Sequence, residues 1–141
     1  MTNRLIKDFG TLNEWLISRG FSLFQYTDAQ NCVFWETREI HINSRMHIEK
    51  RLYVLIHECG HVLINSNRER TYALSKSANV SHFVKISKVK RVSVIAEEIE
   101  AWRRGERLAS RLSVEIDLRK FDKFKTSCLM GYIHWAAEQD L

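Results

Sequence analysis

Two histidines and a glutamate in this sequence stand at the spacing that a metal-dependent hydrolase needs. The segment His57-Glu58-Cys59-Gly60-His61 has the pattern HExxH. Residues four apart on a helix share a face, so both imidazoles can reach one ion. Glu58, next to His57, can then reach a water molecule on that ion and act as a general base. The spacing therefore predicts a catalytic metal site.

The residues around this pattern predict a helix from about Met46 to Ile64, capped by Ser44, with two distinct faces. One face is an apolar stripe formed by Ile48, Leu52, Leu55, Cys59 and Val62. At about 100° per residue, His57 and His61 lie roughly 140° to 180° from the centre of this stripe. Val54 borders the histidine face. We therefore expect that face to line a site and not simply to meet solvent.

A second helix, predicted from about Val92 to Leu112, offers the third ligand that a catalytic zinc ion needs. Glu98 falls near the middle of its apolar arc. A carboxylate there is costly unless a cation or strong donors meet it, and a zinc ion would do so. Glu97 and Glu100 project with the arginines on the expected solvent face. Glu98 is therefore predicted to complete a Zn²⁺ site with the two histidines.

Other assignments for the third ligand stay open. Glu98 could instead form a buried ion pair with an arginine. His82 is a rival third ligand in a basic, loop-like segment. Glu106, at the edge of the same arc, is a weaker candidate and could instead form a hydrogen bond to one of the ligands.

Small residues predict that the two helices cross closely. Gly60 lies between the two histidines. Ala101, Gly105 and Ala109 share the apolar arc of the second helix. Glycine costs about 1 kcal/mol relative to alanine inside a helix, so Gly105 is expected to have a packing reason.

The rest of the chain predicts an α+β fold in a single domain over residues 1–141. A short helix from about Leu12 to Arg19, with Thr11 as its N-cap, precedes three short antiparallel strands. The strands are predicted at Phe21–Tyr26, Cys32–Trp35 and Glu39–Ile42. A last helix from Leu118 to about Ala137 carries an apolar stripe of Phe121, Phe124, Cys128, Tyr132 and Trp135.

The segment from Asn65 to Lys90 is polar, poorly periodic and rich in positive charge. We expect an irregular excursion there, with a short strand at His82–Ile86. The whole chain has 22 basic and 17 acidic residues, and its net charge of +5 permits an acidic partner without demanding one.

Cysteine usage and hydropathy favour a cytoplasmic protein. The three cysteines are far apart and form no CxxC pair, which predicts neither a disulfide framework nor a cysteine-built zinc site. Cys59 lies on the packing face of its helix and is expected in the core. No apolar run reaches the roughly 18 residues that span a bilayer, and Met1–Gly10 lacks the apolar stretch of a signal peptide.

The two motifs resemble those of the gluzincin metallopeptidases, in particular the small ImmA/IrrE-type (minigluzincin) proteins. The likeness rests on LIHECGHVL at Leu55–Leu63 and on EIEAWRRG at Glu98–Gly105. It implies a zincin-like architecture, with a small antiparallel sheet packed on the HExxH helix, a glutamate-ligand helix and a C-terminal helix. By position it also implies zinc ligands His57, His61 and Glu98, and Glu58 as the catalytic base.

The resemblance implies a peptidase whose partner is a protein or peptide substrate, such as a regulatory protein, in a bacterial or phage setting. The family commonly has Asn or Asp four residues after the glutamate ligand, whereas this chain has Trp102, which cannot accept a hydrogen bond from a ligand histidine. An extended substrate is expected to pair with an edge strand at Glu39–Ile42. The candidate oxyanion donors are Tyr72, His82 and Tyr132.

The competing interpretation is a non-catalytic protein. It would be a zincin-fold regulator or a nucleic-acid-associated protein. With His82 as the third ligand, the site would instead resemble that of the DNA-associated SprT-like metalloproteases, which use three histidines. Nucleic acid would then contact the basic residues Lys85, Lys88, Lys90 and Arg91. A structural zinc site has four protein ligands, and the sequence offers no obvious fourth, which favours catalysis.

Overall fold

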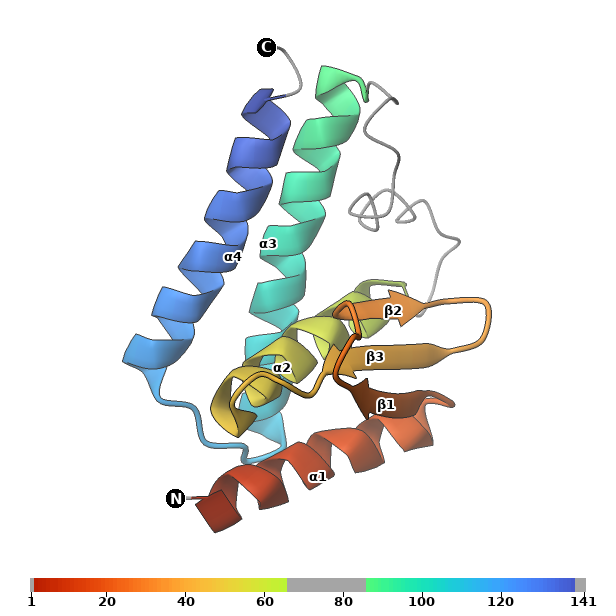
Figure 1. Cartoon of the computed structure of the whole chain (residues 1–141), viewed down its shortest axis with the longest axis vertical. Coiled ribbons are helices and arrows are strands. Elements are labelled where there is room, and N and C mark those ends of the chain that lie inside the picture. The colour runs from red at the N-terminus through yellow and green to blue at the C-terminus, as the bar shows by residue number, and fades with distance from the viewer. Residues whose placement is uncertain (1, 66–85, 139–141) are drawn as a thin grey trace.

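The computed structural model describes residues 2–65 and 86–138, which form an α+β fold as predicted (Figure 1). Along the chain the elements are α1 (Thr2–Ser18), β1 (Ser22–Tyr26), β2 (Cys32–Phe34), β3 (Glu39–Asn43), α2 (Ile48–Asn65), α3 (Lys88–Arg111) and α4 (Leu118–Glu138). Within the described ranges, no helix is both long and apolar enough to cross a bilayer. The expected strand at His82–Ile86 lies almost wholly outside the described residues.

The sheet is mixed, so the prediction of three antiparallel strands is wrong. Its order is β1-β3-β2, with β1 parallel and β2 antiparallel to β3. The alternation of side chains is the same for both pairing directions, so the sequence pattern could not distinguish them. The segment Glu39–Ile42 is therefore the central strand, and the expectation that it pairs with a substrate as an edge strand is also wrong. Of the two edge strands, β2 lies beside the candidate site.

Helix α1 begins ten residues earlier than predicted, at Thr2 instead of Leu12. Thr11 is not an N-cap, because its hydroxyl donates to the carbonyl oxygen of Lys7 within the helix (3.1 Å). Phe9 continues the buried stripe toward the N-terminus, and this burial stabilises the additional turns. Gly20, with φ +83°, ends the helix as its position predicts.

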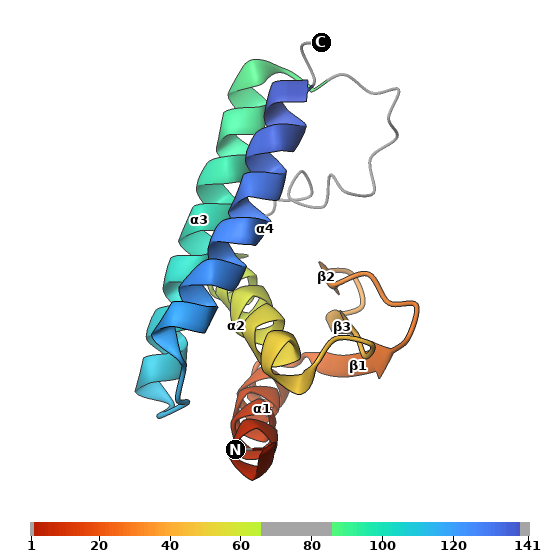
Figure 2. The same cartoon turned by 60° about the vertical axis from the view of Figure 1, so that its left-hand side comes forward.

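The helices and the sheet enclose one core around α2. Figure 2 shows α2 between the sheet on one side and the side-by-side pair α3 and α4 on the other. Fully buried core side chains include Leu12, Leu16, Ile40, Ile42, Leu52, Leu55, Cys59 and Phe121. Cys59 is thus a core residue as predicted. The N-terminus of α2 differs from the prediction, since His47 and not Ser44 precedes it and its Nδ1 accepts from the Glu49 amide (3.2 Å).

Candidate metal centre

His57 and His61 lie one turn apart on the face of α2 that meets α3. Their Nε2 atoms are 3.1 Å apart. The side chain of His57 is 13% exposed and that of His61 6% exposed. Both imidazoles are therefore largely removed from water while sharing one small volume.

Glu98 reaches the same volume from α3. Its Oε2 lies 2.6 Å from His57 Nε2 and its Oε1 lies 3.1 Å from His61 Nε2, while its side chain is 1% exposed. The candidate ligand atoms of these three residues all lie within 4.8 Å of one another. The structure thus brings together the three side chains that the sequence predicts as ligands.

Two glycines make this approach of α2 and α3 sterically feasible. A Cβ on Gly60 would collide with the backbone carbonyl of Ala101. Reciprocally, a Cβ on Gly105 would collide with the backbone carbonyl of Ile56. The predicted packing reason for Gly105 is confirmed, and the crossing occurs beside the residues that carry the cluster.

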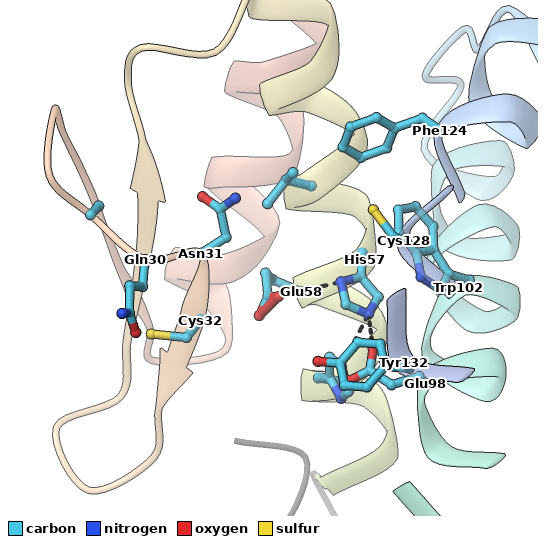
Figure 3. Close-up of a pocket in the computed structure, with 13 residues that line it drawn as sticks. Gln30, Asn31, Cys32, His57, Glu58, Glu98, Trp102, Phe124, Cys128 and Tyr132 are labelled. Atoms are coloured by element: carbon cyan, nitrogen blue, oxygen red, sulfur yellow. Dashed lines mark hydrogen bonds and ion pairs between the residues drawn. The ribbon is translucent and has the colours of Figure 1, made fainter. Parts of the chain in front are cut away.

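The cluster forms part of the wall of a cavity of about 400 Å³ (Figure 3). Glu58 also lines the cavity, is 3% exposed, and places Oε1 3.4 Å from His57 Nδ1. One side of the cavity is formed by Gln30 and Asn31, which precede β2, and by Cys32 at its start, and the other side carries Trp102, Phe124, Cys128 and Tyr132. A substrate chain entering between these sides would meet both Glu58 and the cluster.

The ionisation of the three clustered groups is strongly coupled. Burial by itself lowers the pKa of His57 and of His61, but the adjacent Glu98 outweighs it, so both pKa values are raised, that of His61 to about 10. Burial alone would raise the pKa of Glu98, yet the two histidines outweigh it and lower that pKa. The carboxylate and the imidazoles therefore favour each other's charged forms, and a divalent cation bound at the same point would compete with protons for the imidazole nitrogens.

The donor set matches what a zinc ion binds. Two imidazole nitrogens and a carboxylate oxygen, with an open position toward the cavity, are typical of a catalytic zinc site. Tetrahedral bonds of about 2.0 to 2.1 Å place ligand atoms about 3.3 Å apart. The observed separations of 2.6 and 3.1 Å need only small side-chain shifts to reach that value.

Glu97 is not on the solvent face, and in this respect the prediction is wrong. Its Oε2 lies 3.2 Å from His61 Nδ1, and its side chain is only 19% exposed. The interface between α3 and α2 is wide, so the residue next to Glu98 also faces the histidines. Glu100 does lie with the arginines, contacting Arg103 and Arg104 at 3.2 and 2.8 Å.

Trp102 contacts the cluster by stacking. Its ring lies parallel to that of His57, with centroids 4.4 Å apart and an interplanar angle of 14°. Trp102 is 2% exposed and also packs edge-on against Phe121 and Phe124. Trp102 therefore presents a flat aromatic surface to His57, where the resemblance implied a hydrogen-bond acceptor.

The other candidate residues that the structure describes lie away from the cluster. His47 and His134 are exposed, and His41 bonds to Glu39 and Tyr26 on the sheet. Glu106 pairs with Lys125 at 3.9 Å. The rival ligand His82, the donor candidate Tyr72 and the basic residue Lys85 lie outside the described residues.

Among the described residues expected to contact nucleic acid, Arg91 is buried. Lys88 and Lys90 are exposed, but Arg91 is 4% exposed and donates to the carbonyl oxygen of Ala136 (2.5 Å). Its guanidinium therefore links α3 to α4 and is not available to a phosphate backbone.

Sequence reasoning missed Glu97 and the wall residues Gln30 and Asn31. The signal for Glu97 was its position directly beside Glu98. Gln30 and Asn31 stand in a turn without periodicity, so only the three-dimensional fold could place them. Comparison with known proteins finds no family model, no curated protein and no solved structure that matches this chain.

Proposed function

We propose that this chain binds one zinc ion through His57, His61 and Glu98 and hydrolyses peptide bonds in a protein or peptide substrate. The observation that carries the proposal is the meeting of these three side chains at one point, beside Glu58 in the wall of one cavity. The gluzincin-like motifs and the α+β fold support a zincin-type architecture for it. No fourth His, Cys, Asp or Glu joins the cluster among the described residues, which favours a catalytic over a structural site.

Glu58 is the proton carrier in this proposal. A bound zinc ion would supply Lewis-acid polarisation of the scissile carbonyl and lower the pKa of water. The Glu58 carboxylate accepts a proton from the attacking water and returns it to the nitrogen of the leaving amine, so it is regenerated in each cycle. Its burial beside His57 holds it at the cavity wall where that exchange must occur.

Tyr132 is the donor that we propose for the developing oxyanion. It lines the same cavity from α4. Burial and the negative charges of Glu98 and Glu58 raise the pKa of Tyr132, so its phenol keeps the proton that it would donate.

A cysteine nucleophile is a poorer explanation for the cavity. Cys128 lines it, but burial and the charge of Glu98 raise the pKa of this thiol to about 11. A thiol with such a pKa is almost entirely protonated at neutral pH and reacts slowly.

The test is cleavage of a peptide library, read by mass spectrometry, with wild-type protein and with Glu58→Gln. We expect wild type to cleave and to stop when a chelator removes the metal. Glu58→Gln should still bind zinc but lose about a hundredfold to ten-thousandfold in rate, the usual contribution of a general base. Equal cleavage by both proteins would refute the proposed mechanism.

A further inference from the structure

Both ring nitrogens of His61 have acidic neighbours. Nε2 lies 3.1 Å from Oε1 of Glu98, and Nδ1 lies 3.2 Å from Oε2 of Glu97. The side chain of His61 is 6% exposed, so water competes little for either nitrogen. Adjacent residues of α3 thus approach opposite nitrogens of one ring.

This arrangement has a specific consequence for metal binding. A histidine binds a metal through one nitrogen while the other carries a proton. A carboxylate that accepts this second proton fixes the tautomer and the ring orientation and makes the ligand nitrogen more basic. In this chain a carboxylate at Nδ1 leaves Nε2 directed toward His57 and Glu98.

We infer that Glu97 is the positioning residue for His61. The inference rests on the proposed metal site and adds a residue to it. Trp102, one turn after Glu98, offers no hydrogen-bond acceptor and stacks on His57 instead. Glu97, which directly precedes Glu98 in the sequence, supplies an acceptor for His61 Nδ1. One short stretch of α3 then provides both a ligand, Glu98, and the support for another ligand.

The experiment is a Co²⁺ titration of the intact chain, followed by the visible d–d absorption of the bound ion. The variants are Glu97→Ala and Glu97→Leu, which remove the acceptor, and Glu97→Gln, whose amide oxygen can still accept from Nδ1. Glu100→Ala is the matched control, because it removes one negative charge from the same helix but pairs with arginines.

We expect Glu97→Ala and Glu97→Leu to bind Co²⁺ about tenfold to a hundredfold more weakly and with a shifted d–d spectrum. Glu97→Gln should restore most of the affinity and the wild-type spectrum, and Glu100→Ala should match wild type. Wild-type affinity and spectrum in both acceptor-free variants would overturn the positioning role of Glu97 but leave the metal site itself standing. No Co²⁺ binding by wild type would overturn the metal site and this inference with it. Failure of both acceptor-free variants to fold, while Glu97→Gln folds, would assign Glu97 to stability and also overturn its positioning role.

Discussion

His57 and His61 lie one turn apart on α2, yet their rings are held in different ways. A flat indole, Trp102, covers the face of His57, whose Nδ1 approaches Glu58 at 3.4 Å. His61 has no such stacking partner among the described residues and contacts the Glu97 carboxylate through Nδ1. Both rings line the cavity and both have a carboxylate near Nδ1, so the stacked indole is what distinguishes His57 from the more buried His61.

This difference separates two tasks within one small site. His57 stands next to Glu58, which in the proposed mechanism exchanges a proton with water and product. The aromatic face of Trp102 restricts the His57 ring without adding a further proton acceptor near Glu58. His61 is farther from solvent and can use a permanent acceptor.

The largest expected effect is on the helix crossing that both histidines share. Gly60→Ala places a methyl group against the Ala101 carbonyl, so the helices must separate. We expect the free energy of unfolding to fall by about 3 kcal/mol or more. Zinc affinity should fall as well, because Glu98 moves away from both rings. Chemical denaturation and zinc titration measure the two effects.

Gly131→Ala is the matched control for this variant. Gly131 also lies inside a helix, but a Cβ there meets nothing within 4 Å. Alanine should therefore stabilise the protein by about 0.5 to 1 kcal/mol. Loss of stability in Gly131→Ala equal to that in Gly60→Ala would contradict the account of the crossing.

A smaller effect on stability and zinc affinity is expected when only the stacking on His57 is removed. Trp102→Leu removes the stacked ring from His57 and opens a cavity, and we expect a loss of about 2 kcal/mol of stability. Zinc affinity should fall about tenfold, as for other groups that orient a ligand. Phe121→Leu provides the control, since Phe121 is equally buried and packs on Trp102 and Tyr53. It should lose similar stability but keep its zinc affinity. The same loss of affinity in both variants would mean that Trp102 acts only through general packing.

The smallest expected effect is on the number of protons that are released when zinc binds. The raised pKa of His61, about 10, means that zinc must displace a proton from this cluster near pH 7, and the raised pKa of His57 favours further proton release. Calorimetry in two buffers of different ionisation enthalpy should show proton release, and apparent affinity should rise with pH until it passes the His61 pKa of about 10. Glu98→Gln removes the charge that contributes most to raising both histidine pKa values, so fewer protons should be released per bound ion at zinc concentrations that saturate this weaker-binding variant. Equal proton release per bound ion in both proteins would contradict the coupling.

The same shifts predict the pH dependence of stability without metal. The folded pKa of His61 exceeds its ordinary value of 6.5, so its contribution is complete below about pH 6.5 and is lost as pH rises toward 10. The folded pKa of Glu98 lies below its ordinary value of 4.5, so its contribution is present above that pH and is lost in acid. The cluster should therefore stabilise the metal-free protein most between about pH 4.5 and 6.5, as melting temperatures can show.

Helical periodicity predicted much of what positions the cluster. The histidine face of α2, the burial of Glu98 and the packing reason for Gly105 follow from helical periodicity and residue type, whereas the faces of α3 were predicted only in part, since Glu97 also meets α2. The start of α1 did not, because its first turns depend on distant contacts. Asp8, 2% exposed, accepts from Arg4 and from the backbone of Glu115.

Other features lay beyond a one-dimensional pattern. The direction of β1 relative to β3 depends on how the chain crosses over, which side-chain alternation does not encode. Glu97 was placed with the solvent because a helical wheel assumes one narrow buried face. The close crossing at Gly60 and Gly105 widens that face, so adjacent residues of α3 both reach α2.

The most direct test of the metal site is a zinc titration against a competing chelator, with wild type, Glu98→Ala and Glu100→Ala compared at one pH. We predict one zinc ion per chain for wild type and for Glu100→Ala. Glu98→Ala should bind about a hundredfold more weakly or worse, since it loses one of three ligands. Wild-type affinity in Glu98→Ala would contradict the site and would make His82 the leading candidate for the third ligand.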